Sequence, residues 1–199
     1  MSELFVRSKQ EWRVHLKKSA EAFFSQKQNG QKSQAEAQLQ NNLIDYLSAR
    51  TGLWGGYQAL PQEPNIALAV EKLKNLEWVF SRVNSDQGSG QHLRWFKVGE
   101  MGFELGSFAI QEPVISGAQE IPQQKIQGFL IPGLGFDRKG NRLGWGKGFY
   151  DRTLADFRGL KIGVAFSSQV VTSLPSEAHD VKMDLVITEK EVIKINSGS

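Results

Sequence analysis

The chain has 199 residues, with 24 Lys and Arg against 21 Asp and Glu, three His and no Cys, and 40% of its residues are hydrophobic. This length and composition fit a single globular domain over residues 1–199, and they exclude disordered, collagenous and disulfide-stabilised classes. Without Cys there is no disulfide, cysteine–zinc site or cysteine nucleophile. The net charge of +3 suits an anionic ligand, but the near balance of charges gives no strong field.

The N-terminal residues 1–13 are polar and charged, and no stretch reaches the ~18 apolar residues that a membrane span needs. We therefore expect a soluble, cytoplasmic protein without membrane contact. Apolar residues recur at steps of three and four over residues 8–24, which predicts an amphipathic helix. Lys9, Arg13 and Lys17 lie four residues apart on it. This cationic stripe is either a solvated face or a contact for an anion.

Beyond this helix the pattern changes to a polar loop over residues 26–34. Apolar spacing over residues 35–47 predicts a second helix that stops by Gly52. Residues 57–61 fit a short edge strand, and residues 66–76 again have helical spacing.

Two strand-like runs follow, at residues 78–83 and 93–98. The turn-rich residues between them, 84–90, are explained most simply as a hairpin loop. Residues 115–125 have no clear periodicity and predict a loop.

The second half contains four short apolar, β-branched runs, at residues 128–131, 161–166, 184–188 and 192–195. Such runs are typical of buried strands. Between the first two, residues 150–157 predict a helix opened by a glycine-rich loop. The order of strand, loop, helix and strand is a βαβ unit, which predicts an α/β protein with a parallel sheet covered by helices.

The glycine-rich loop is the strongest chemical signal, because six of the chain's 20 glycines lie between Gly133 and Gly148. Its centre reads Gly144-Trp145-Gly146-Lys147-Gly148, with Arg142 just before it. Glycines let backbone N–H groups approach an anion, and the following helix N-terminus and the two cations add positive charge. The pattern is neither a Walker loop nor a dinucleotide fingerprint. It predicts a polyphosphate site, with a tight or mobile turn as the alternative.

Two acids extend this site. Asp151 follows the loop, and Asp180 lies in a turn before the run at 184–188. Carboxylates of this kind hold Mg²⁺ together with phosphate oxygens, and parallel-strand topology brings such loops to one sheet edge. The alternatives are a first-turn helix acid for Asp151 and a turn-forming residue for Asp180. We interpret the neighbouring His179 as a surface or supporting residue and Asp184 as structural.

Three aromatic residues accompany the loop, Trp145, Phe149 and Tyr150. They are candidates both for core anchors and for a stacking wall against a flat heterocycle.

The strings from Pro132 to Asp137 and from Gly140 to Asp151 resemble the signature of the 5-formyltetrahydrofolate cyclo-ligases, also called methenyltetrahydrofolate synthetases. Further fragments agree in order: Lys9 with Arg13, Glu63, residues 110–113, residues 163–166, Gln169, residues 174–175 and residues 179–184. The resemblance implies a three-layer α/β/α fold with a mostly parallel central sheet. It also implies an enzyme that uses ATP and Mg²⁺ to close 5-formyltetrahydrofolate to 5,10-methenyltetrahydrofolate.

The resemblance further implies roles for individual residues. It assigns catalytic roles to Lys147, Arg142 and Tyr150. ATP would be bound by Lys9, Arg13, Arg142, Leu143, Gly144, Trp145, Gly146, Lys147, Gly148, Phe149 and Tyr150. Folate would be bound by Glu63, Trp145, Phe149 and Tyr150, and Mg²⁺ by Asp151 and Asp180. It implies a monomer that acts on small molecules and binds no nucleic acid.

Three positions depart from the family pattern. Phe149 replaces the usual Tyr, Trp145 replaces Tyr or Arg, and Ile66 stands where the family often has Thr. An aromatic face is kept at the first two, so stacking should survive. The divergent middle third leaves open a relative that acts on another formamide or regulates folate-linked metabolism. The pI of about 9.1 and the basic first helix leave open a module that binds an acidic partner such as RNA.

Overall fold

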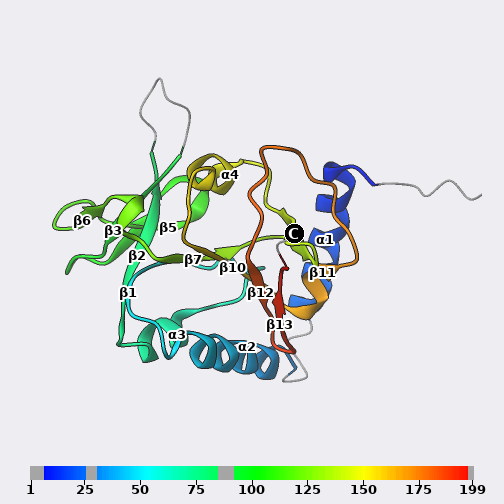
Figure 1. Cartoon of the computed structure of the whole chain (residues 1–199), viewed down its shortest axis with the longest axis horizontal. Coiled ribbons are helices and arrows are strands. Elements are labelled where there is room, and N and C mark those ends of the chain that lie inside the picture. Colours follow the sequence, from blue (N-terminus) through cyan, green and yellow to red (C-terminus); the bar gives the residue numbers. More distant parts are fainter. Residues whose placement is uncertain (1–6, 26–30, 85–91, 197–199) are drawn as a thin grey trace, which may run out of the picture.

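The structure is a computed structural model that describes residues 7–25, 31–84 and 92–196 (Figure 1). The predicted hairpin loop at 84–90 and the first part of the loop at 26–34 lie almost entirely outside these ranges. Within the described ranges, no helix combines the length and the apolar character that crossing a membrane would require.

The main sheet, as far as the structure describes it, has eight strands in the order β13-β12-β10-β7-β1-β2-β3-β6. Their bounds are β1 Gly52–Gly56, β2 Leu76–Val83, β3 Leu93–Lys97, β6 Gln119–Ile121, β7 Gly128–Pro132, β10 Leu160–Val164, β12 Leu185–Ile187 and β13 Val192–Lys194. The five central strands, from β12 to β2, pair in parallel, whereas β13, β3 and β6 pair antiparallel at the two edges. The predicted mostly parallel sheet is confirmed.

Helices cover both faces of this sheet (Figure 1). Along β7, Leu130 joins one apolar core and Phe129 and Ile131 join the other, because successive strand residues point to opposite faces. The first core is covered by α2 (Gln31–Leu47) and α3 (Ala67–Lys72), and the second by α4 (Phe149–Leu154). The predicted three-layer architecture is therefore confirmed.

A smaller sheet carries the glycine-rich loop. It has the order β11-β8-β9 and consists of β8 (Gly135–Asp137), β9 (Arg142–Leu143) and β11 (Val170–Val171). Fully buried Asp137 accepts hydrogen bonds from the backbone N–H groups of Lys139, Asn141 and Leu174 and from the Asn141 amide. This carboxylate braces the turn between β8 and β9.

Helix α1 (Lys9–Ser25) packs on that small sheet through Leu16, which contacts an apolar cluster of Leu134, Leu143 and Leu174. The packing brings the N-terminal end of α1 beside the glycine-rich loop, although about 130 residues separate them in the sequence.

Next to the main sheet, β4 (Phe103–Leu105) and β5 (Gln111–Pro113) pair antiparallel. The short 3₁₀ turn η1 (Ser107–Ala109) joins them, and two further such turns are η2 (Gln123–Lys125) and η3 (Ser167–Gln169). We call residues 103–113 the β4–β5 hairpin. Phe108 and Ala109 in its turn both have left-handed backbone angles, with φ of 59° and 57°.

Three of the predicted elements are wrong. The edge strand expected at 57–61 is absent. The strand in this region is β1, at the preceding residues 52–56, and it lies in the middle of the sheet. Its glycines lower strand propensity, yet Gly55 is required because the Phe129 ring occupies the space of a side chain there. Residues 119–121, expected in a loop, form edge strand β6, and residues 31–34 begin α2. Both are polar segments that depend on neighbours for their structure.

Candidate functional site

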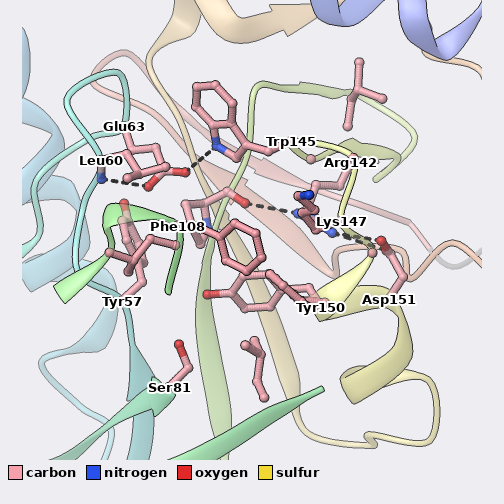
Figure 2. Close-up of a pocket in the computed structure, with 18 of the residues that line it drawn as sticks. Tyr57, Leu60, Glu63, Ser81, Phe108, Arg142, Trp145, Lys147, Tyr150 and Asp151 are labelled. Atoms are coloured by element: carbon pink, nitrogen blue, oxygen red, sulfur yellow. Dashed lines mark hydrogen bonds and ion pairs between the residues drawn. The ribbon is translucent and has the colours of Figure 1, made fainter. Parts of the chain in front are cut away.

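A cavity of about 750 Å³ opens at the carboxyl ends of β1, β2 and β7. Most of its walls come from the start of α1, the segment after β1, the end of β2, the β4–β5 hairpin, the glycine-rich loop with α4, and residues 177–180. Leu93 of β3 and Pro132 of β7 add to them. Figure 2 shows its centre. We call the part near Lys9, Arg13, Arg142, Lys147, Asp151 and Asp180 the charged end, and the part near Tyr57, Glu63, Phe108, Trp145 and Tyr150 the aromatic end.

At the charged end, α1 reaches the loop before β12. The Lys9 ammonium lies 2.7 and 2.8 Å from the two Asp180 carboxylate oxygens and 3.3 Å from Glu177. Burial raises the pKa of Asp180, but the Lys9 hydrogen bond, the Glu177 backbone N–H and the charges of Lys9 and His179 outweigh it, so the pKa lies below its ordinary value. Asp180 is held ionised by a neighbour that is itself a predicted phosphate ligand.

The second acid of the charged end pairs with Arg142. The Arg142 guanidinium lies 3.1 Å from an Asp151 carboxylate oxygen and donates to the Pro132 carbonyl at 3.3 Å (Figure 2). Its side chain is only 5% exposed, and its Nε has no partner among the described residues. A buried N–H without a partner is costly, so this atom is available to a ligand oxygen.

The glycine-rich loop completes this end. Arg13 on α1 donates to the Gly144 carbonyl at 3.2 Å, and a side chain at Gly146 would contact this arginine. Gly146 and Gly148 have φ of +100° and +64°, values that favour glycine. Exposed Lys147 contacts no carboxylate in the described part of the chain, and its ammonium lies 4.9 Å from the Phe108 ring centre. An exposed cation and the glycines on either side of it thus line the cavity.

At the aromatic end, Glu63 is 5% exposed. Its carboxylate accepts hydrogen bonds from Leu60 N–H at 3.0 Å and from Trp145 Nε1–H at 2.9 Å (Figure 2). Burial raises the pKa of Glu63 above its ordinary value, and these two bonds and the charge of Arg142 only partly oppose that rise. Glu63 is therefore a buried acid held in a fixed orientation.

Two tyrosines lie beside Glu63. Burial raises the pKa of Tyr150, with a further contribution from the Glu63 charge, while Arg142 and a hydrogen bond with Ser81 oppose it. Burial and the Glu63 charge likewise raise the pKa of Tyr57, whose hydroxyl donates to the Pro64 carbonyl at 2.7 Å. Both phenols stay protonated at neutral pH and act as hydrogen-bonding groups.

Every predicted site residue lines this one cavity. Asp151 and Asp180 come to the same wall, but their partners in the structure are Arg142 and Lys9, an arrangement that the sequence did not indicate. Exposed His179 lies 3.2 Å from Glu177 and 3.8 Å from Asp180, in agreement with its interpretation as a supporting residue. Asp184 binds Lys161, as expected of a structural residue.

Sequence reasoning assigned no role to many of the lining residues, among them Tyr57, Ser81, Phe108 and Glu112. Ser81 and Tyr57 carry no motif and enter only through strand topology. Glu112 and Phe108 lie in or next to a fragment, residues 110–113, that was noted without a role.

The donor set fits a hard cation. Asp151 and Asp180 offer carboxylate oxygens beside a loop suited to phosphate, and Mg²⁺ takes one or two carboxylates with phosphate oxygens. In the part of the chain that the structure describes, Glu177, His179 and Asp180 place one ligand atom each within 4.8 Å of the others.

The chain was compared with known proteins. A family model described as the 5-formyltetrahydrofolate cyclo-ligase family matches residues 6–189. Over 91 residues the chain is 36% identical to the 5-formyltetrahydrofolate cyclo-ligase of Escherichia coli (strain K12), which covers 44% of this chain and 50% of that protein. The protein of the same name from Mycolicibacterium smegmatis is 35% identical over 114 residues, 55% of this chain and 58% of that one. These matched stretches span about half the length of the curated relatives.

Solved structures match over more of the chain. A structure of the Aquifex aeolicus 5,10-methenyltetrahydrofolate synthetase has a TM-score of 0.73 and 29% identity, and the match covers 96% of this chain and 94% of that one. A Mycoplasma pneumoniae protein of the same name has a TM-score of 0.70 at 23% identity, a likeness of fold.

Proposed function

The chain belongs to the 5-formyltetrahydrofolate cyclo-ligase family, and on that premise we propose that it converts 5-formyltetrahydrofolate and ATP into 5,10-methenyltetrahydrofolate, ADP and phosphate. The observation that carries the proposal is that one cavity joins a charged end suited to polyphosphate to an aromatic end with a buried acid. A substrate that spans both ends can react where they meet, at Arg142 and Tyr150, which lie 5.2 Å apart from guanidinium to ring centre.

The reaction needs activation of a poor electrophile. In an N5-formamide, nitrogen donates electrons into the carbonyl, and oxygen is a poor leaving group. Transfer of the γ-phosphoryl group of ATP to the formyl oxygen makes that oxygen part of a phosphate group. Phosphate is a good leaving group. The N10 amine then attacks the same carbon, the C–O bond breaks, and N10 loses its proton. Because N10 belongs to the same molecule, the attack is effectively intramolecular.

The charged end would position the nucleotide. Four cations line this end of the cavity: Lys9 and Arg13 from α1, and Arg142 and Lys147 from β9 and the loop that follows it. Phosphoryl transfer depends on positioning and on neutralising charge at the phosphate oxygens. ATP would exchange the Lys9–Asp180 and Arg142–Asp151 contacts for contacts with phosphate.

Asp151 and Asp180 are the residues that would hold Mg²⁺ here. When bound, the ion would neutralise negative charge on the phosphate oxygens and orient them. Both carboxylates lie against cations of the site, Asp151 against Arg142 and Asp180 against Lys9, and the Lys9 contact helps to lower the pKa of Asp180.

The aromatic end would bind the pterin. Glu63 is an acceptor suited to the donor-rich edge of that ring, and Trp145 orients its carboxylate. Phe149 and Tyr150 add aromatic surface to the same wall. Tyr150 and Ser81 supply hydrogen-bonding hydroxyl groups within it.

The test follows the near-ultraviolet absorbance of the conjugated methenyl product. Purified protein is mixed with 5-formyltetrahydrofolate, with and without ATP and with and without Mg²⁺. We expect product only when both are present. No product from folded protein that binds ATP would overturn the proposal and favour another formamide as substrate.

A further inference from the structure

The β4–β5 hairpin forms one wall of the cavity, and no local pairing to the main sheet explains its position. Phe108, Ile110, Gln111 and Glu112 all line the cavity. The hairpin strands pair only with each other in the described structure. Contacts other than backbone pairing must therefore hold the hairpin in place.

Side chains from β2 supply that attachment. Glu112 is 3% exposed, and its carboxylate accepts a hydrogen bond from Val83 N–H at 3.2 Å. Arg82 Nε lies 3.6 Å from its other oxygen, and Arg82 also donates to the Pro113 carbonyl at 2.9 Å and to Glu104 at 2.5 Å. Because Glu112 is buried and charged, its two partners are needed to keep it there.

The turn packs directly on this carboxylate. A Cβ built at Gly106 would lie 2.3 Å from the Glu112 carboxyl group. Only glycine permits that approach, so the turn from Gly106 to Ile110 closes over Glu112. The Gly106 N–H donates to the Ile110 carbonyl at 2.8 Å across the same turn.

The residue that this turn presents is Phe108. Its ring lies 5.5 Å from the Phe149 ring and 4.9 Å from the Lys147 ammonium, and it points into the cavity (Figure 2). It is nevertheless 46% exposed, so packing alone does not fix it. Phe108 and Ala109 both have left-handed backbone angles, a strained state that persists only where the surroundings enforce it.

We propose that Glu112 is a positioning residue for the substrate pocket, which acts by holding the Gly106–Ile110 turn so that the Phe108 ring forms a wall for the flat ring of the folate substrate. The assignment rests on the proposed function for the identity of the substrate. Glu112 touches no reacting atom; its effect passes through the turn to Phe108.

The first experiment compares Glu112→Gln with Glu104→Gln. Both remove one carboxylate partner of Arg82, but Glu104 is 47% exposed, whereas Glu112 is buried and lies directly against Gly106. We expect Glu112→Gln to raise the KM for 5-formyltetrahydrofolate about tenfold and that for ATP less than threefold, and Glu104→Gln to change neither. An unchanged folate KM in folded Glu112→Gln protein overturns the assignment.

A double-mutant cycle tests the route of the effect. We expect Phe108→Ala to raise the folate KM, and the double variant Phe108→Ala with Glu112→Gln to be no worse than Phe108→Ala alone. Effects that multiply in the double variant would show that Glu112 acts without Phe108.

Hydrogen exchange of substrate-free protein provides a readout independent of activity. We expect the amides of residues 106–110 to exchange at least tenfold faster in Glu112→Gln than in the wild type, with the parallel strands unchanged. Equal exchange in that turn would contradict the assignment. If the wild type makes no methenyl product, the proposed function fails, and this measurement then decides alone whether Glu112 holds the turn.

Gly106→Ala is a second way to displace the Gly106–Ile110 turn. It leaves Glu112 in place but forces a methyl group against its carboxylate. We expect the same split between folate and ATP KM as in Glu112→Gln. Wild-type KM values for both substrates in Gly106→Ala would overturn the proposed packing of the turn.

Discussion

The two ends of the cavity are built on different principles. The charged end is made of ion pairs between acids and cations that a nucleotide would separate, as Lys9–Asp180 and Arg142–Asp151 show. The aromatic end is organised around buried Glu63, whose carboxylate is held by Leu60 and Trp145, and its wall also includes Phe108, which is 46% exposed. A ligand at the first end would have to replace these ion pairs with contacts of its own, because the paired side chains are largely buried. At the second end, Glu63 already has two hydrogen-bond donors, and its carboxylate can accept further bonds from a ligand. We expect substitutions at the charged end to affect turnover and those at the aromatic end to affect substrate affinity.

Among these substitutions, Lys147→Ala at the charged end should have the largest effect. Lys147 is exposed and contributes no ion pair to the described fold, so the melting temperature should not change. A cation that stabilises phosphoryl transfer contributes about 10²–10³ in rate, and we expect kcat to fall by that factor. Steady-state kinetics and thermal unfolding check both statements.

The matched control is Lys139→Ala, at an exposed position of the β8–β9 turn outside the cavity lining. It should keep wild-type kinetics. Equal losses in the two lysine variants would mean that only the overall charge matters.

Glu63→Gln is the corresponding test of the aromatic end. The amide keeps the size of the side chain but offers only one acceptor oxygen, so it cannot satisfy Leu60, Trp145 and the pterin as the carboxylate does. We expect the KM for 5-formyltetrahydrofolate to rise about tenfold, equivalent to ~1.4 kcal/mol, with kcat and the KM for ATP nearly unchanged. A fall in kcat alone would place Glu63 in the chemistry and remove the distinction between the ends.

Trp145→Phe tests the hydrogen bond to Glu63 and should have a smaller effect on folate affinity than Glu63→Gln. It keeps an aromatic ring but removes the N–H that donates to Glu63. Losing one of its two hydrogen bonds should raise the pKa of Glu63 further and raise the folate KM about threefold. The pH dependence of folate binding measures the shift; an unchanged profile would mean that this bond does not orient the acid.

The smallest effect is on stability, and it has opposite signs at the two ends. The pKa of Asp180 is lowered below 3.8, so its contribution is present above that pH and is lost as the pH falls through the folded-state pKa. The pKa of Glu63 is raised above 4.5, so its ionisation opposes folding above the folded-state pKa, and the penalty disappears as the pH falls toward 4.5.

Urea unfolding of Asp180→Asn and Glu63→Gln against the wild type measures these signs. Lowering the pH should shrink the advantage of the wild type over Asp180→Asn below pH 3.8. Lowering the pH from neutral to 4.5 should raise the free energy of unfolding of the wild type relative to that of Glu63→Gln. Parallel pH profiles for all three proteins would contradict both pKa directions.

Much of the second half of the fold was predictable, because β7, β12 and, apart from Lys161, β10 are short apolar runs of the kind typical of buried parallel strands. The place of the glycine-rich loop and Asp151 in the cavity was predictable for a similar local reason, because the glycines, the cations and the acid lie close together in the sequence. Strand β1 was not predictable, because glycine disfavours strands and the reason for Gly55, the Phe129 ring packed against it, is visible only in the folded structure. The role of Phe108 was not either, because it depends on Glu112 and Arg82 from other elements.

The sequence by itself determined the α/β class, the glycine-rich loop and the resemblance to a family, because these depend on local periodicity and on residues that are close in the chain. The tertiary structure decided which acid faces which cation, how deeply Glu63 is buried and where the β4–β5 hairpin lies. These properties depend on distances across the sheet edge, where Lys9 meets Asp180 over 171 positions and Trp145 meets Glu63 over 82. Burial and pairing set the charge state of each group, and neither exists before the strands come together.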